Sequence, residues 1–233
     1  SGWSWSPFFL DVDLDGYEDI IISTGHFHDA LDADALNRVG SQTYMTLEAW
    51  QKQILIFPEL QIPNVAFRNR GNLQFENMGE NWGFASTDIT NGMALGDLDN
   101  DGDLDIVANR FDAPAGVYRN ESTTPRLTVR LRGLPPNTQG IGAKILVTGG
   151  PVQQSKEVIS AGTYLSSSDT IYMFACGDEG DNLKIEVNWR SGKKSLVENV
   201  KANRVYEIYE LGQSQRTGRF LIQARILSRI LKM

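Results

Sequence analysis

Two short acidic segments carry the residues best suited to chemistry in this chain. Residues 11–19 read Asp-Val-Asp-Leu-Asp-Gly-Tyr-Glu-Asp, and residues 97–105 read Asp-Leu-Asp-Asn-Asp-Gly-Asp-Leu-Asp. Each segment places Asp at positions 1, 3, 5 and 9 and Gly at position 6. Carboxylates this close repel one another unless a cation lies among them. Calcium takes about six to eight oxygen ligands, which alternate residues of a tight loop can supply, so the segments predict two calcium sites.

The predicted ligands are four carboxylates and one backbone carbonyl in each loop. In the first loop they are Asp11, Asp13, Asp15 and Asp19, with the carbonyl of Tyr17. In the second loop they are Asp97, Asp99, Asp101 and Asp105, with the carbonyl of Asp103. The glycine at position 6 allows the sharp turn that aims these oxygens inward.

An EF-hand loop begins in the same way, but it requires Glu at position 12 and a helix after the loop. Position 12 is Ile22 in the first segment and Ala108 in the second. Residues 20–22 and 106–108 are short apolar runs, which are typical of buried strands. We therefore expect each loop to lead into a strand.

Both loops resemble those of FG-GAP/VCBS repeats, the calcium-bearing blades of integrin-type β-propellers. Residues 2–9 and 91–96, which precede the loops, fit this resemblance, and each copy continues to a shared ending, Phe-Arg-Asn at 67–69 and Tyr-Arg-Asn at 118–120. The resemblance implies that residues 1–122 form propeller blades. A segment of about 120 residues makes only two blades, so we expect a partial propeller, with further blades before Ser1 or a partner covering the open edge.

The first copy contains an insert, residues 25–64, which holds both histidines of the chain. Residues 46–53 predict a short helix within it. His26 and His28, close in sequence to several aspartates, have the ligand types of a transition-metal site. We favour the alternative of a polar loop rim in which histidine is hydrogen-bonded to aspartate, because no spacing such as H-E-x-x-H supports the metal.

Residues 126–211 predict a small β-sandwich of six or seven short strands, because apolar and polar side chains alternate in runs separated by turn-rich links. Residues 137–144 read Asn-Thr-Gln-Gly-Ile-Gly-Ala-Lys and, with residues 162–166 and 187–193, resemble the ASPIC/UnbV domain. FG-GAP blades followed by this domain resemble the cartilage acidic protein family and its bacterial relatives. Gly140 and Gly142 lack the third glycine and the helix of a phosphate loop, so we expect them to serve backbone packing.

The tail, residues 212–233, predicts a basic amphipathic helix. Its charged residues are all basic, and Ile222, Ile226 and Ile230 recur at a spacing of four. The helix is too short and too charged to span a bilayer. It could lie on a membrane surface, dock on a partner or fold back onto the acidic blades. The predicted fold class is thus all-β: a partial β-propeller, a small β-sandwich and a C-terminal amphipathic helix.

Composition narrows the function. The chain has 233 residues and a net charge of −7, which argues against nucleic acid as a partner. Cys176 is the only cysteine, so no intrachain disulfide forms. No signal peptide and no run of about 18 apolar residues occurs, so no transmembrane segment is expected. Nucleophile-elbow, P-loop, C-x-x-C and dinucleotide-binding motifs are missing as well, so we do not expect an enzyme.

We expect a non-catalytic, calcium-binding module of adhesion or scaffolding type, with a protein or glycan partner. Calcium is millimolar outside cells, which suits weak calcium sites, and proteins of the related families are usually exported. Both points favour an extracellular, periplasmic or cell-surface location. Two alternatives stay open. The chain could be a subunit of a larger assembly, docked through the open blade edge and the basic tail. It could also be an accessory or catalytic protein of a biosynthetic pathway, as the UnbV resemblance implies.

Overall fold

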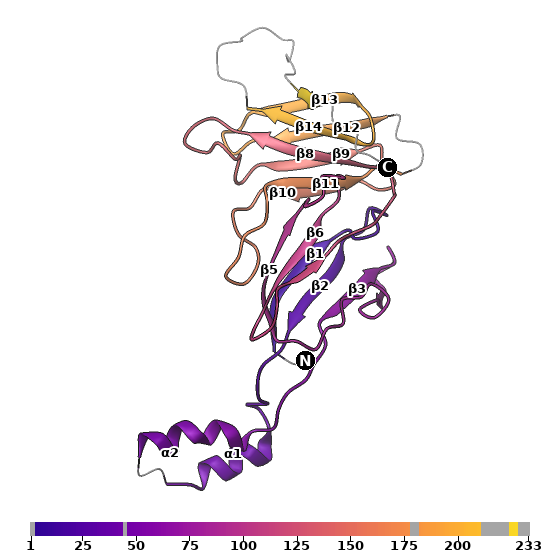
Figure 1. The fold of residues 1–233 in the computed structure, drawn as a ribbon. Coiled ribbons are helices and arrows are strands. Elements are labelled where there is room, and N and C mark those ends of the chain that lie inside the picture. The colour runs from indigo at the N-terminus through magenta and orange to yellow at the C-terminus, as the bar shows by residue number, and fades with distance from the viewer. Residues whose placement is uncertain (1–2, 44–45, 178–181, 211–223, 228–233) are drawn as a thin grey trace.

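Four open β-sheets build most of the chain (Figure 1). The computed structural model describes residues 3–43, 46–177, 182–210 and 224–227. Within these ranges two short α-helices accompany the sheets, and no closed propeller is present. The described helices are all too short to cross a membrane. The expectation of a mainly β protein is confirmed, whereas the propeller is represented only by open sheets.

Each aspartate loop joins two antiparallel strands. The first sheet has the order β1-β2-β3-β4 and the second has the order β5-β6-β7. Their bounds are β1 Ser4–Leu10, β2 Asp19–Thr24, β3 Val65–Asn69, β4 Phe75–Asn77, β5 Thr90–Gly96, β6 Asp105–Arg110 and β7 Gly116–Tyr118. Because β2 and β6 begin at the last aspartate of each loop, the prediction of a strand rather than a helix at these points is confirmed.

The insert between β2 and β3 forms a helical unit that lies apart from the sheets (Figure 1). It contains α1 Ala33–Gly40, α2 Leu47–Lys52 and the 3₁₀-helix η1 Gln53–Ile56. The side chain of Asp32 accepts a hydrogen bond from the Ala35 amide, and that of Thr46 accepts one from the Ala49 amide. These side chains satisfy amides that a helix leaves free at its start, which explains why both helices begin where they do. The helix expected over 46–53 is confirmed.

The second half of the chain forms two packed sheets. One has the order β10-β9-β12-β13, and the other has the order β11-β8-β14-β15. Their bounds are β8 Arg126–Arg132, β9 Lys144–Thr148, β10 Gln154–Glu157, β11 Ile171–Ala175, β12 Leu183–Asn188, β13 Lys194–Val200, β14 Arg204–Tyr209 and β15 Ala224–Leu227. β14 runs parallel to β8, and the other pairs are antiparallel. Both sheets contribute to one buried apolar cluster, so they form the expected sandwich.

The Asn-x-x-Gly-Ile-Gly segment closes on itself by side-chain hydrogen bonds. The Asn137 amide group donates to the carbonyl of Ile141 at 2.9 Å, and its oxygen accepts from the Ile141 amide at 2.9 Å. Gly140 has a φ of 69°, and a Cβ added there would lie 3.0 Å from the ring of Trp189. This geometry gives Gly140 the backbone-packing role expected from the sequence.

The sheet containing β8 and β11 is covered on both faces, which ties the sandwich to the blades. On β11, Phe174 belongs to the sandwich core, while Ile171, Met173 and Ala175 belong to a second buried cluster. That second cluster also holds Leu10 and other residues of the two blade sheets. The blades and the sandwich therefore share a core, and the aspartate loops lie at this junction.

The helix expected in the tail is wrong for the residues that can be checked. Ala224–Leu227 is a strand, β15, that pairs antiparallel with β14, and the rest of residues 212–233 lies outside the described ranges. The physical reason is that a spacing of four residues is compatible with both a helix and a strand. Residues four apart share a face of a helix, but because four is even they also share a face of a strand. The open edge of β14 offers backbone partners, and isoleucine favours strands.

Candidate metal centre

The first aspartate of each loop closes a tight turn by accepting two backbone amides. Asp11 accepts hydrogen bonds from the amides of Asp15 at 3.0 Å and Gly16 at 2.9 Å. Asp15 in turn accepts from the amide of Tyr17 at 2.9 Å. Gly16 has a φ of 97°, a conformation that glycine adopts without steric cost. The turn therefore folds the chain around the carboxylates at positions 1 and 5.

Asp19, the last aspartate of the first loop, links the loop to β3. Asp19 is fully buried and accepts from the amides of Val12 at 2.9 Å and Asn69 at 2.8 Å. Asn69 ends β3, and its own side chain donates to the Glu18 carbonyl at 3.1 Å. These bonds tie the end of β3 to the first loop through Asn69.

The second loop repeats the backbone amide bonds of the first, whereas the Asn120 side chain donates to the Val12 carbonyl of the first loop at 2.9 Å. Asp97 accepts from the amides of Asp101 and Gly102, both at 3.1 Å, and Asp101 accepts from the amide of Asp103. Asp105 accepts from the amides of Leu98 at 2.8 Å and Asn120 at 2.9 Å. Each of the two segments, although they lie far apart in the chain, thus forms its own acidic cage, closed by backbone amides at equivalent positions.

In each cage three carboxylates converge. Ligand oxygens of Asp11, Asp13 and Asp15 all lie within 4.8 Å of one another. The same is true of Asp97, Asp99 and Asp105 in the second loop. These two clusters could hold metal ions.

Asp19 and Asp101 fall outside these two clusters as defined by that distance. Asp19 has both oxygens engaged by amides, and Asp101 faces Arg126, with Oδ2 lying 3.3 Å from a guanidinium nitrogen. Coordination by their side chains, and by the carbonyls of Tyr17 and Asp103, stays a prediction.

A buried carboxylate oxygen without a partner supports the fit of a cation. Oδ1 of Asp13 is buried and accepts no hydrogen bond, although a lone acceptor in this position is costly. A hard cation that takes oxygen ligands would satisfy it. The donor set, made of carboxylates alone, is the type that calcium or magnesium prefers over softer metals.

Arginine side chains lie against both cages. Arg68 lies 2.5 Å from Asp13 and 3.4 Å from Asp15, and Arg119, at the equivalent place in the second copy, lies 4.0 Å from Asp99. In the first cage the guanidinium thus partly neutralises two of the predicted ligands. A cation that binds Asp13 and Asp15 must compete with Arg68.

Burial raises the pKa of five carboxylates in and beside the cages. The pKa of Asp11 and of Asp19 is raised to about 7 and that of Asp103 to about 8, mainly because these groups are removed from water. Burial also raises the pKa of Asp13 and of Asp97. The metal-free cages therefore favour partly protonated carboxylates near neutral pH.

The raised pKa values predict how the metal-free protein responds to pH. A carboxylate whose pKa is higher in the folded than in the unfolded state stabilises the fold below its ordinary pKa, and this contribution is lost as the pH rises through the folded value. In EDTA we therefore expect the melting temperature to fall from about pH 5 to about pH 8, by roughly 3–5 °C per pH unit for each proton released. Differential scanning calorimetry across this range is the measurement, with a matched series in excess calcium.

Calcium should flatten the decline, because an ion that binds the carboxylates displaces the same protons. A melting temperature that rises with pH in EDTA over this window would contradict the pKa directions given above.

Residues at the start of the sandwich and in the link before it are hydrogen-bonded to both loops. Arg126, at the start of β8, donates to the Asp101 carbonyl at 2.8 Å, and Thr128 donates to the Gly102 carbonyl at 3.2 Å. Arg126 is 7% exposed and also lies 3.4 Å from Asp103, a fully buried carboxylate that accepts no hydrogen bond. The second loop is thus held by two side chains of one sandwich strand.

The first loop is held to the sandwich by a different set of contacts. Thr124, in the link before β8, donates to the Asp13 carbonyl at 3.1 Å. Lys156 on β10 pairs with Glu18 at 2.9 Å, and a Cβ added to Gly16 would lie 2.8 Å from a methyl group of Val152. Sequence reasoning missed Arg126 and Lys156 as neighbours of the loops, because neither lies in the repeat that carries them.

The histidines of the insert are hydrogen-bonded to the backbone rather than to aspartate, which corrects that part of the loop-rim expectation. Nδ1 of His26 lies 2.6 Å from the His28 carbonyl, and Nδ1 of His28 lies 2.9 Å from the Phe57 carbonyl. The ring of His26 also stacks on Trp3 at 4.6 Å between ring centroids. Among the described residues, the two clusters that could hold a metal ion contain no histidine. The geometry therefore favours a structural role over the transition-metal alternative.

Comparison with known protein families agrees with this geometry. Residues 61–108 match the FG-GAP-like repeat, and this segment includes the second aspartate loop. Residues 133–215 match the ASPIC and UnbV family, which corresponds to most of the sandwich. No curated protein matches the chain. Aspartate clusters of the observed kind are typical of the calcium loops of FG-GAP repeats.

Proposed function

Since this chain carries an FG-GAP-like repeat followed by an ASPIC/UnbV domain, we propose that it is a calcium-binding, non-catalytic binding or scaffolding module. The observation that carries the proposal is the pair of matching carboxylate cages, each closed by the same backbone amides. In this role calcium is structural: it neutralises the cages and fixes the strands that leave them. The partner we propose is a protein or a glycan.

The position of the cages supports a structural role for the ion. Both loops lie at the junction where the blades meet the sandwich, and main-chain carbonyls of both accept hydrogen bonds from residues 124–128. Ordering a loop by ion binding therefore also orders the surface on which the sandwich rests. Calcium would in this way couple the folding of the two parts.

Calorimetric titration of the metal-free chain tests the proposal. We expect two calcium ions per chain, and one ion for each of the variants Asp13→Asn and Asp99→Asn, because each removes a charged ligand at position 3 of one loop. Asp34→Asn is the matched control, since Asp34 is an exposed aspartate of the insert. A stoichiometry unchanged by either loop variant, or no heat of binding at all, would overturn the proposal.

The same titration bears on location. We propose that the protein works outside the cell, in the periplasm or at the cell surface. Extracellular calcium modules have dissociation constants of roughly 10⁻⁴–10⁻³ M, while cytosolic sensors lie at about 10⁻⁷–10⁻⁵ M. A measured constant in the extracellular range supports this location, and one below about 10⁻⁶ M argues against it.

A further inference from the structure

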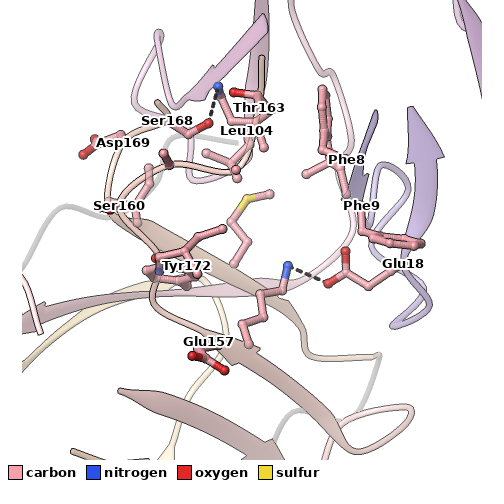
Figure 2. A pocket seen from close by; sticks show the side chains of 18 of the residues that line it. Phe8, Phe9, Glu18, Leu104, Glu157, Ser160, Thr163, Ser168, Asp169 and Tyr172 are labelled. Atoms are coloured by element: carbon pink, nitrogen blue, oxygen red, sulfur yellow. Dashed lines mark hydrogen bonds and ion pairs between the residues drawn. The ribbon is translucent and has the colours of Figure 1, made fainter. Parts of the chain in front are cut away.

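A cavity of about 640 Å³ lies where the first blade sheet meets the sandwich. Figure 2 shows its two sides: Phe8, Phe9 and Glu18 from the blade face the loop after β10 and Tyr172 of β11. The volume falls within the roughly 300–1,000 Å³ of typical small-molecule sites, and such sites occur preferentially between domains. No aspartate of the two carboxylate clusters lines the cavity, although Glu18 and Leu104 of the two loops do.

The part of the cavity that lies against the shared core is apolar, and serine and threonine residues add hydroxyl groups elsewhere in the lining. Leu10, Leu104 and Met173 line it and are buried against the shared core. Phe8 and Tyr172 add aromatic surface, while Phe9 is 66% exposed although it lines the same cavity. An apolar side chain so exposed beside an apolar cavity gains contact area when a ligand occupies the cavity. The lining therefore favours a small ligand whose body is mostly apolar and carries an aromatic ring.

The charges that line the cavity decide which ligands it should reject. Lys156 is neutralised by Glu18 at 2.9 Å. The other charged lining residues, Glu157 and Asp169, are carboxylates, each about half exposed. Their basic partners do not line the cavity and lie 3.9 Å and 3.6 Å away. The lining thus has an excess of negative charge, which disfavours an anionic ligand.

We propose that this cavity binds a small, largely apolar aromatic molecule that carries no negative charge. The inference does not depend on calcium, so all measurements are made at one fixed calcium concentration. Two fluorescent probes with the same aromatic skeleton test it: N-phenyl-1-naphthylamine, which is neutral, and 1-anilinonaphthalene-8-sulfonate, which is anionic. We expect saturable binding of the neutral probe, with an affinity about tenfold higher than that of the anionic probe.

A variant that fills the cavity locates the binding. Ala161 lines the cavity from an exposed loop position, and Ala161→Trp should lower the affinity for the neutral probe by about tenfold or more. Ser167→Trp is the matched control, because Ser167 is a small, exposed residue of the same loop that does not line the cavity. The control should keep the affinity of the original chain.

A second variant keeps the proposal testable if Ala161→Trp disturbs the fold. Phe9→Ala removes an exposed aromatic side chain from the cavity wall, so it should weaken the binding of the neutral probe. Val117→Ala, which changes an exposed residue of another strand, should leave that binding unchanged. Binding that is non-saturable, that prefers the anionic probe, or that is equal in Ala161→Trp and Ser167→Trp would overturn the proposal. If the cavity accepts only a side chain of a partner protein, the binding of the probe should be non-saturable.

Discussion

Adding about 10 mM calcium to the metal-free chain should raise its melting temperature by roughly 10–20 °C. If each cage has a dissociation constant of about 10⁻⁴ M, this concentration is about a hundredfold excess and stabilises the fold by about 2.7 kcal/mol per site. Two sites then contribute about 5 kcal/mol, and 1 kcal/mol shifts the melting temperature of a chain of this size by about 2–4 °C. Scanning calorimetry in EDTA and in calcium measures the shift directly.

The double variant Asp13→Asn, Asp99→Asn is the informative control, because it removes one ligand charge from each cage without a change in side-chain size. Its melting temperature should respond to calcium by only a few degrees, and each single variant should keep about half of the original shift. A large calcium shift that survives in the double variant would place the ion somewhere other than the two cages.

The cages could be anticipated from sequence because every contact that closes them is local or repeated. Asp11 binds amides four and five residues ahead, and Asp97 does the same. Spacing alone fixes such contacts. The role of Asn69 and Asn120 was visible only as a shared ending, since their amides reach the loops across a strand.

The junction could not be anticipated in this way. β11 reads Ile-Tyr-Met-Phe-Ala, a run with apolar residues on both faces, which predicts burial on two sides but does not say by what. The structure places the sandwich core on one side and the blades on the other. Such pairing between distant segments leaves no periodic signal in either of them.

Local irregularity weakens the sequence signal of one sandwich strand, β13. β13, Lys194–Val200, buries Val197 and Val200, which are three residues apart. The register between β12 and β13 shifts between Leu183 and Ile185, so the buried side chains do not keep a spacing of two. A bulge of this kind erases the alternation on which strand prediction depends.

The junction also supplies the second large effect that we expect, through Arg126. The residue is 7% exposed, and its guanidinium donates to the carbonyls of Ser122 at 2.7 Å and Asp101 at 2.8 Å and lies 3.4 Å from the fully buried Asp103. Replacing one partner of a buried ion pair leaves the other charge without compensation and costs about 3–5 kcal/mol. Arg126→Met should therefore lower the melting temperature in EDTA by roughly 6–20 °C.

The pH dependence of this loss distinguishes a charge effect from lost packing. Burial raises the pKa of Asp103 to about 8, and Arg126 opposes that rise, so in Arg126→Met the carboxyl should hold its proton to still higher pH. At about pH 6 Asp103 is protonated and uncharged, so the variant should lose less stability than at about pH 9. At about pH 9 the carboxyl of Asp103 tends to ionise, but in the variant it no longer has a cation beside it. Packing alone would give the same loss at both values.

Two further variants complete the argument on Arg126. Adding Asp103→Asn to Arg126→Met removes the uncompensated charge, so it should recover part of the lost stability, most clearly at high pH. Arg119→Met is the matched control: it alters an arginine beside the same loop whose side chain is 60% exposed, and it should leave the melting temperature nearly unchanged. Equal losses in Arg126→Met and Arg119→Met would show that the sandwich does not hold the second cage through this side chain.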